Sequence, residues 1–465
     1  MAIKNTSPQQ IASIVEAQHK FFHTGKSRKY DFRREQLQKL QKALKQWSQP
    51  ICQALWQDLH KSEQEAILTE LSIVEGEIKN HLHNLKGWMR AKRCPTPLKM
   101  MPSRSRVVSE PLGNALIISP WNYPVQLLLN PLLGAISAGC TAILKPSPYV
   151  PNMSRVIEEM ITETFENRYV AVVQGNRDVN AALLDERFDI IFFTGSPSLG
   201  KKVMASAAKN LTPVVLELGG KSPCIVDADA DIKIAARRIA WGKTLNAGQT
   251  CIAPDYLLIH RSREKEFVEA FRKALTRLHG NDIKASKHYV RLVTDKAFAR
   301  VSGYLNDGKV VLGGSTDAKE RYIEPTLLAG VSPDSPVMQE EIFGPVFPVI
   351  SINDSNKSFT DKAIEFVTSR EKPLAFYYFG KESDGWEVIR RTSSGGGCIN
   401  DVIMHIANEN VPFGGVGNSG MGNYHGKLSF DAFSHRRAVV TTPTWLDLPF
   451  RYMPYRMFGL VKKLL

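Results

Sequence analysis

The chain has 465 residues, of which 43% are hydrophobic and 23% charged, and a formal net charge of +14 at pH 7. This length exceeds one simple core and predicts two or three domains, while the composition is that of an ordinary globular protein. The positive charge is compatible with a solvated basic surface, anionic lipid or phosphate-bearing ligands. Nucleic acid is disfavoured, because the sequence has no zinc-finger, aromatic RNA-binding or basic-zipper pattern.

The six cysteines are scattered along the chain without paired spacing. This distribution disfavours a disulfide framework and a zinc site, so we expect no metal and a reducing compartment. Residues 1–10 lack the apolar core of a signal peptide, and no run of about twenty apolar residues could span a bilayer. We therefore expect a cytoplasmic protein.

The first hundred residues predict helices. Large apolar residues recur at three- and four-residue steps over 31–59, and Pro50 is expected to divide this stretch into two helices. Another long helix is expected over 69–89. The basic stretch 90–106 contains three prolines and is expected to be an extended connector that leads to a strand pairing elsewhere.

From Gly113 onward, short apolar strands alternate with helices. Strands are expected at 115–118, 141–144, 169–173, 189–193 and 214–218, and helices at 125–138, 153–167, 181–184 and 197–209. Strands that are apolar throughout are typical of a parallel sheet covered on both faces, as in a Rossmann-like α/β domain. Such sheets bind ligands beyond the carboxyl ends of their strands.

The alternation resumes after Glu217 and predicts a second α/β domain that reaches to about residue 400. Its first strands are expected at 223–226 and 256–260, and its first helices at 232–245 and 264–278. The glycine-dense stretches 394–397 and 414–422 are expected to be neither helix nor strand, and either low complexity or a structured loop beside a site would explain them. The apolar, basic segment 445–465 could pack on the body, lie on a membrane surface or cover a substrate entrance.

Two stretches carry the strongest chemical signals. Cys251 follows the short polar segment 246–250, and a cysteine acts as a nucleophile when a base or a positive charge generates its thiolate. Glu217 stands in an apolar run that ends in two glycines, where a carboxylate is either buried at a cost or held for use. Taken alone, Cys251 would more often be a small buried hydrophobe and Glu217 the end of a strand.

Four further stretches carry polar residues in turns. Asn122 could donate a hydrogen bond to a developing oxyanion or could be a simple turn residue. Lys145 could reach ribose hydroxyls or a phosphate, or could lie on the surface. The turn 194–198 opens a helix whose free N–H groups suit a pyrophosphate, although its glycine spacing is not the dinucleotide fingerprint. The stretch 339–345 pairs carboxylates with Phe343, and a solvated helix end is the alternative.

Together these stretches resemble one family. ISPWNYP, LKPS, FTGS, LELGGKSP, NAGQTC, EEIFGP and PFGGVGNSGMG occur in this order over residues 118–422 and are similar to those of the NAD(P)-dependent aldehyde dehydrogenases. The stretch GNYHGKLSFDAFSHRR and the apolar basic tail resemble the class 3 branch, which includes fatty-aldehyde dehydrogenases.

The resemblance implies a role for each matching residue. Cys251 corresponds to the catalytic nucleophile, Glu217 to the general base and Asn122 to the oxyanion donor, and Tyr123 would line the substrate tunnel. The residues expected to bind the cofactor are Ser119, Trp121, Lys145, Ser147, Gly195, Ser196, Gly219, Glu341 and Phe343.

The resemblance also implies a domain organisation. Residues 1–97 and 112–218 would form the cofactor-binding domain and residues 219–423 the catalytic domain. Residues 98–111 and 424–440 would form a small β arm that pairs with a second subunit in a homodimer, followed by an apolar basic tail at 441–465, which could contact a membrane peripherally.

The implied reaction is the oxidation of an aldehyde to a carboxylic acid through a thiohemiacetal and a thioester on cysteine. The tail, the positive charge and the branch favour apolar medium-to-long aldehydes, with fatty aldehydes and apocarotenals as candidates. Pro148 stands where many family members have a ribose-binding glutamate, so we expect NADP to be accepted alongside NAD. A CoA-acylating dehydrogenase and a non-catalytic binding relative are the alternatives.

Overall fold

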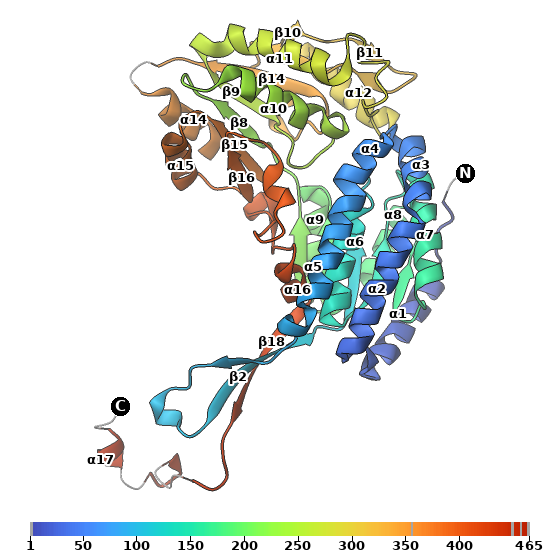
Figure 1. The fold of residues 1–465 in the computed structure, drawn as a ribbon, viewed down its shortest axis with the longest axis vertical. Coiled ribbons are helices and arrows are strands. Elements are labelled where there is room, and N and C mark those ends of the chain that lie inside the picture. Colours follow the sequence, from blue (N-terminus) through green and yellow to red (C-terminus); the bar gives the residue numbers. More distant parts are fainter. Residues whose placement is uncertain (1–2, 355–356, 448–450, 456–457, 463–465) are drawn as a thin grey trace.

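The structure is a computed structural model that describes residues 3–354, 357–447, 451–455 and 458–462. It contains a six-stranded sheet, a seven-stranded sheet and a three-stranded sheet, together with a short two-stranded ladder, β11 (Thr316–Asp317) with β12 (Tyr322–Ile323). Figure 1 shows the seven-stranded sheet at one end of the molecule, the six-stranded sheet in the middle and the three-stranded sheet projecting at the other end. The expected α/β architecture with a small β arm is confirmed.

The six-stranded sheet is parallel except at one edge. Its strands run in the order β17-β7-β6-β3-β4-β5, and β17 pairs antiparallel to β7. The bounds are β3 Asn114–Ile118, β4 Thr141–Lys145, β5 Val170–Val172, β6 Ile190–Thr194, β7 Val214–Glu217 and β17 Gly420–Met421. All residues of β3, β4 and β6 are buried, so both faces of the sheet are covered, as the apolar strands predicted.

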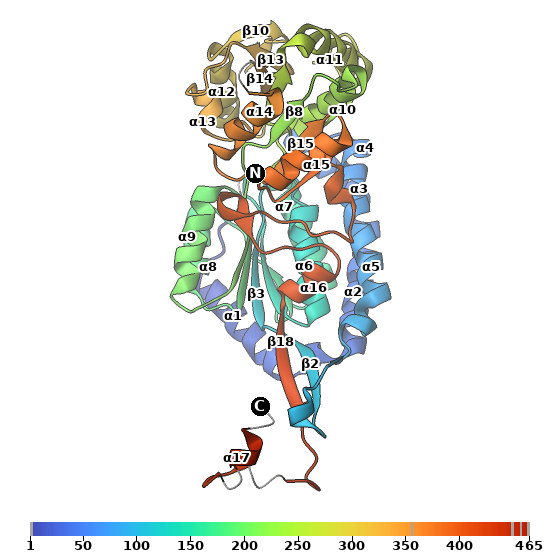
Figure 2. The same ribbon diagram turned by 90° about the vertical axis from the view of Figure 1, so that its left-hand side faces the viewer.

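Helices cover both faces of this sheet. They are α1 Pro8–His23, α2 Tyr30–Gln46, α3 Ser48–Leu59, α4 Glu63–Ala66, α5 Ser72–Trp88, α6 Gln126–Ala138, α7 Pro151–Thr164, α8 Arg177–Asp185 and α9 Pro197–Ala208. A π-helical turn, Ile67–Leu71, joins α4 to α5. Figure 2 shows α8 and α9 on one side of the sheet and α2, α5 and α6 on the other.

The predicted break at Pro50 is wrong by three residues. The helices separate at Trp47, and Pro50 lies in the first turn of α3. A proline is tolerated there because the N–H groups of a first helical turn have no partner within the helix.

The seven-stranded sheet has the order β10-β13-β14-β9-β8-β15-β16 and is parallel except for β10. Its strands are β8 Pro223–Val226, β9 Tyr256–His260, β10 Lys309–Leu312, β13 Thr326–Ala329, β14 Val346–Ile352, β15 Ala375–Phe379 and β16 Gly396–Ile399. The accompanying helices are α10 Ile232–Thr244, α11 Glu264–His279, α12 Asp295–Gly303, α13 Pro336–Gln339, α14 Phe359–Thr368 and α15 Glu382–Arg391.

The glycine-dense stretches are more regular than expected. Gly396 and Gly397 begin β16, and a Cβ on Gly397 would lie 2.3 Å from the carbonyl oxygen of Phe376 on the neighbouring strand. Gly420 belongs to β17, where a Cβ would lie 2.2 Å from the carbonyl oxygen of Leu216. These glycines allow strands to approach closely, which the composition alone did not distinguish from a loop.

The three-stranded sheet forms the arm. It consists of β1 (Lys92–Cys94), β2 (Arg104–Pro111) and β18 (Ser434–Thr441), and β2 pairs antiparallel with both neighbours. The stretch 90–106 is therefore a hairpin with a 3-10 turn at Leu98–Met100, and the expectation of a purely extended connector is wrong. The expected pairing of its strand with a distant segment is confirmed by β18.

The C-terminal part follows the arm. Helix α16 (Lys427–Ala432) precedes β18, and α17 (Phe458–Val461) lies beyond it. Part of the tail expected at 441–465 lies outside the described residues. None of the helices in the described ranges is long and apolar enough to cross a bilayer.

Candidate active site

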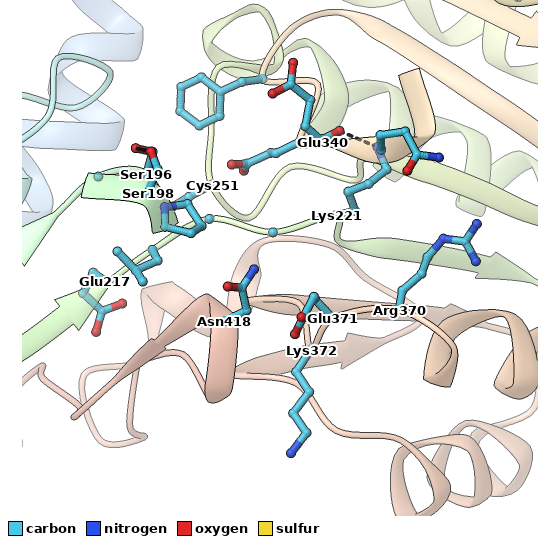
Figure 3. Close-up of a pocket in the computed structure, with 18 of the residues that line it drawn as sticks. Ser196, Ser198, Glu217, Lys221, Cys251, Glu340, Arg370, Glu371, Lys372 and Asn418 are labelled. Atoms are coloured by element: carbon cyan, nitrogen blue, oxygen red, sulfur yellow. Dashed lines mark hydrogen bonds between the residues drawn. The ribbon is translucent and has the colours of Figure 1, made fainter. Parts of the chain in front are cut away.

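Two cavities meet at Cys251. The larger has a volume of about 1090 Å³ and the smaller about 500 Å³, and five residues line both: Leu127, Thr194, Glu217, Leu218 and Cys251. Figure 3 shows the larger cavity with Cys251 and Glu217 toward one end and Lys221 and Arg370 toward the other. A thiol and a carboxylate, far apart in the sequence, thus stand at the junction of two binding spaces.

An unusual turn places Cys251 at this junction. After α10, three successive residues have left-handed backbones, Asn246 (φ 51°), Ala247 (φ 52°) and Gly248 (φ 73°). The backbone N–H of Asn246 donates to Glu65 Oε1 at 2.9 Å. A Cβ on Gly248 would lie 2.4 Å from the carbonyl oxygen of Gly344, so this position requires glycine.

The two ionisable groups at the junction both favour their neutral forms. Burial raises the pKa of the Cys251 thiol far above its ordinary value, and the carboxyls of Glu341 and Glu217 raise it further. Glu217 is 3% exposed, and neither of its carboxyl oxygens has a hydrogen-bond partner among the described residues. Burial therefore raises the pKa of Glu217 well above its ordinary value, so the thiol needs a base and the carboxyl is a stronger base than usual.

Asn122 is held beside the cysteine loop. Its side chain is 2% exposed, and Nδ2 donates to the carbonyl oxygen of Gln249 at 3.0 Å. The side-chain Nδ2 of Asn246 donates in turn to the backbone carbonyl oxygens of Asn122 and Gln249, both at 3.0 Å. The next residue, Tyr123, shares a 2.8 Å hydrogen bond with the Thr250 hydroxyl and lines the smaller cavity. Hydrogen bonds thus join the segment 122–123 to the segment 246–250, which precedes Cys251, in one unit.

Sequence reasoning missed a buried ion pair beneath this unit. Lys61 and Glu70 have fully buried side chains, and Lys61 Nζ donates to Glu70 Oε1 at 2.8 Å. Lys61 also donates to the carbonyl oxygen of Asn122 at 3.0 Å, and Glu70 Oε2 accepts from the N–H of Val125 at 2.7 Å. The pair therefore fixes the turn that carries Asn122 and Tyr123.

A signal for Glu70 was present in the sequence. It stands four residues from Ala66 and from Val74, both of which are buried, so the helical spacing places it on the buried face. A carboxylate on that face requires a partner. The spacing does not identify the partner, because Lys61 belongs to the segment between α3 and α4.

The start of α9 borders the larger cavity. Gly195, Ser196, Pro197 and Ser198 line it, and the N-cap residue Ser196 makes no side-chain cap hydrogen bond. Pro197 has no N–H, and the N–H groups of Leu199 and Gly200 donate to the carbonyl oxygen of Ser196 at 3.1 and 2.9 Å. Among the described residues the N–H of Ser198 has no backbone acceptor, so it is available to an anion. A Cβ on Gly195 would lie 2.6 Å from the ring of Phe193.

The larger cavity is also lined by three other residues that the sequence predicted to bind the cofactor. Trp121 and Phe343 are in edge contact, with ring centroids 5.4 Å apart, and both line the cavity together with Glu341. A Cβ on Gly219 would lie 1.9 Å from Glu341 Oε2, so the carboxyl rests directly on the glycine.

Three residues expected to bind the cofactor lie outside the described walls of both cavities: Ser119, Lys145 and Ser147. All three are buried where β3 and β4 end. Lys145 Nζ donates to the carbonyl oxygen of Pro146 at 2.8 Å, and burial lowers the pKa of Lys145 to about 8. The Ser119 hydroxyl has no partner among the described residues.

These residues fit a nicotinamide dinucleotide. The cavity is of the size expected for a large ligand, the first turn of the twelve-residue helix α9 presents the N–H of Ser198 at its wall, and Gly219 leaves room for the Glu341 carboxyl. The smaller cavity is lined mainly by apolar side chains, among them Ile73, Leu127, Trp241, Ile403 and Phe413. It fits the apolar part of a second ligand.

Comparisons with known proteins agree with this geometry. Residues 1–439 match the family described as the aldehyde dehydrogenase family. The chain is 46% identical to 4,4'-diaponeurosporen-aldehyde dehydrogenase of Staphylococcus aureus over 94% of this chain and 95% of that protein. It is 45% identical to the dimeric NADP-preferring aldehyde dehydrogenase of Rattus norvegicus over 92% and 94%, respectively.

A solved structure agrees as well. The substrate-bound state of Staphylococcus aureus AldH superposes with a TM-score of 0.95 at 45% identity and covers 98% of this chain and 99% of that one. The resemblance drawn from the seven motifs is confirmed. The chain therefore belongs to the aldehyde dehydrogenase family and is an oxidoreductase that acts on aldehydes with NAD or NADP.

Proposed function

We propose that the protein oxidises apolar medium-to-long aldehydes to carboxylic acids, with Cys251 as the nucleophile and Glu217 as the general base. The observation that carries this proposal is the apolar cavity of about 500 Å³ that ends at Cys251 and Glu217. Fatty aldehydes and apocarotenals are the substrate classes that fit such a lining. The Staphylococcus aureus relative is named for its action on 4,4'-diaponeurosporen-aldehyde, which supports the same choice.

The chemistry begins with sulfur. Cys251 Sγ bonds to the aldehyde carbon and loses its proton, and of the residues common to both cavities only Glu217 is a carboxylate that can accept it. The resulting oxyanion accepts hydrogen bonds from Asn122 Nδ2 and the N–H of Cys251 in this proposal. Each such donor contributes on the order of 3 kcal/mol of transition-state stabilisation.

The oxidation step uses both cavities, because they meet at Cys251. When NAD or NADP is bound in the larger cavity, it supplies the acceptor for the hydride that leaves the thiohemiacetal carbon. The cysteine then carries a thioester. After Glu217 has released the first proton to solvent, it takes a proton from the water that attacks the thioester carbon. The carbon–sulfur bond then breaks, the carboxylic acid leaves, and the departing thiolate takes up that proton to regenerate the thiol.

Cofactor choice is proposed from Pro148, which carries no carboxylate that would repel a 2′-phosphate. The cofactor residues proposed from the motifs are Ser119, Trp121, Lys145, Ser147, Gly195, Ser196, Gly219, Glu341 and Phe343. NADP is then accepted alongside NAD. A preference for NAD beyond about a thousandfold in kcat/KM, which corresponds to roughly 4 kcal/mol, contradicts this proposal.

We propose the same division into domains that the resemblance of the motifs implies. Residues 1–97 and 112–218, apart from β1 (Lys92–Cys94) in the arm sheet, hold the cofactor. Residues 219–423 hold the cysteine, and the segments 98–111 and 424–440 contribute the arm through which two copies pair as a homodimer. A cytoplasmic location and a peripheral contact of the tail 441–465 with membranes complete the proposal.

A chain-length series of alkanals tests the substrate class, with NAD and NADP each monitored by reduced-cofactor absorbance. Each methylene buried in the apolar cavity should raise kcat/KM about fourfold, because it contributes about 0.8 kcal/mol. A kcat/KM that stays flat from about two to ten carbons contradicts the proposal. The same assay with and without CoA separates hydrolysis from the CoA-acylating alternative, since only an acyl-transferring enzyme forms an acyl-CoA.

A further inference from the structure

One wall of the smaller cavity comes from α5 and from the π-helical turn before it. Pairs of cavity-lining residues recur there at four-residue intervals, so they share one face of the helix. They are Leu68, Thr69, Ser72, Ile73, Gly76 and Glu77. A ligand in this cavity therefore contacts the helix along that face.

The polar groups of this wall are engaged within the protein. The hydroxyls of Thr69 and Ser72 donate to backbone carbonyl oxygens one turn earlier in the helix, at 2.7 and 3.0 Å. The carboxylate of Glu77 accepts from Nδ1 of His425 at 2.8 Å. Because these groups already have partners, the wall suits an alkyl chain better than a polar one.

Gly76 stands in this wall, in the interior of α5. A glycine inside a helix is destabilising relative to alanine, because glycine loses more backbone freedom on folding. In four other helices a close neighbour explains the glycine, since a Cβ would lie only 2.6 to 2.9 Å from another atom. These glycines are Gly134 in α6, Gly200 in α9, Gly242 in α10 and Gly385 in α15.

No such neighbour lies beside Gly76. Apart from its chain neighbours and the backbone of its own helix, no described atom lies within 4 Å of the position that a Cβ would take there. Its φ is not positive, so the backbone conformation does not require glycine either. Neither packing nor conformation accounts for this glycine, whereas a ligand in the cavity would use the room that it leaves.

We propose that Gly76 sets the selectivity for long aldehydes: methylenes far from the carbonyl pack against the bare backbone of α5 at this position. This inference rests on the proposed function, because it needs the aldehyde chain to occupy the smaller cavity. An aldehyde too short to reach α5 gains nothing from the glycine, whereas each methylene that reaches it is removed from water.

A chain-length series from propanal to decanal tests the proposal with the variants Gly76→Leu and Gly87→Leu. Gly76→Leu fills the room beside the helix, so kcat/KM for decanal should fall about tenfold or more, the loss expected when about two methylenes are no longer buried. The value for propanal should stay within about twofold of the native one, because no interaction with this short chain is lost.

Gly87→Leu is the matched control. Gly87 lies in the same helix, likewise has room for a Cβ, and lines neither of the two cavities that meet at Cys251. Both substitutions should raise the urea concentration at the midpoint of unfolding, since leucine is the better helix former. Only Gly76→Leu should change the dependence of kcat/KM on chain length.

Four results would overturn the proposal. They are a native chain-length profile in Gly76→Leu, an equal loss for propanal and decanal, the same loss in Gly87→Leu, and a lower unfolding midpoint in Gly76→Leu, which would show that packing requires the glycine. A sedimentation coefficient altered in Gly76→Leu alone would instead assign the glycine to contact between two copies. A native protein whose kcat/KM does not rise with chain length contradicts the proposed function itself, so the two failures are distinct.

Discussion

At the scale of the residue, the site depends on two groups whose proton affinities are raised by burial. Cys251 and Glu217 line both cavities, and Glu217 has no hydrogen-bond partner among the described residues. A buried carboxyl without partners holds its proton to higher pH than a solvated one. Ionisation of Glu217 is therefore a condition for it to act as a base.

The variant Glu217→Gln tests the base in both halves of the reaction. We expect the first turnover of reduced cofactor to slow and the steady-state rate to fall by about a hundredfold or more, because thiol activation and hydrolysis both lose their base. In the native protein the hydrolysis rate should rise with pH through the raised pKa of Glu217, since the ionised form is the active one. In the variant this rise should disappear. Rapid-mixing absorbance over a pH series measures both, and a steady-state rate equal to the native one contradicts the role.

Lys61 and Glu70 give a second prediction at this scale. Lys61→Met leaves the Glu70 carboxylate buried without its partner and should lower the free energy of unfolding by about 3–5 kcal/mol. Adding Glu70→Gln, which keeps an acceptor for the N–H of Val125, should restore most of that loss. Urea denaturation of the two single variants and the double variant measures the coupling. Additive losses would show that the two side chains do not stabilise the turn as a pair.

The sequence predicted the residues that would react at this site better than the buried residues that hold them in place. Cys251, Glu217 and Asn122 stand in motifs of distinctive composition, and the structure brings all three to the larger cavity. The Lys61–Glu70 pair could not be read from the sequence, because no local pattern identifies which buried charges meet. Nor could the sequence distinguish residues that line a cavity, such as Trp121, from those buried just outside its walls, such as Lys145.

At the scale of the element, the strands were predicted well because their residues are apolar throughout. The strand β3 was expected at 115–118 and is Asn114–Ile118, and β9 was expected and found at Tyr256–His260. The errors concern residues whose role depends on a neighbour in space. Pro50 is tolerated by the first turn of a helix, and Gly397 and Gly420 stand in strands because another backbone lies close to them.

A substitution of Gly219 tests the loop that follows β7, because this glycine lies directly against the carboxyl of Glu341. Gly219→Ala places a methyl group where Glu341 Oε2 now lies and should displace that carboxyl into the larger cavity. We expect cofactor affinity to fall about tenfold or more while the fold is retained, because the displaced atoms belong to a side chain.

Titration of the cofactor without aldehyde measures this directly. The control is Gly87→Ala near the end of α5, where a Cβ would meet nothing within 4 Å. That variant should bind the cofactor as the native protein does and be slightly more stable. If Gly219→Ala bound the cofactor with native affinity, the proposal that Gly219 holds the Glu341 carboxyl in place for cofactor binding would be contradicted.

At the scale of the whole molecule, the arm projects at the end opposite the seven-stranded sheet (Figure 1). Its outer strands β1 and β18 each leave one edge unpaired within the described chain, and unpaired edges are templates for pairing with another chain. We therefore expect the protein to sediment at about twice the chain mass of 52.0 kDa. Val439→Pro in β18 should weaken the dimer, because proline removes a backbone donor and disturbs the edge.

Analytical ultracentrifugation over a dilution series measures the dimer, with Val310→Pro in β10, an edge strand of the seven-stranded sheet, as the matched control. Dissociation of the control at the same concentration as the β18 variant would contradict pairing through the arm. The parallel sheets followed from the sequence, but the oligomeric state did not, because edge pairing depends on a second chain.

The meeting of two separate chambers at one sulfur has a kinetic consequence. Their exposed rims differ, with Leu68 and Met404 bordering the smaller chamber and Asp334 and Lys372 the larger. Neither ligand has to pass through the other's space to reach the thiol. Nicotinamide nucleotide and aldehyde can therefore load in either sequence, and an unreactive long-chain mimic of the aldehyde should compete with the aldehyde while leaving the dissociation constant of the nucleotide unchanged.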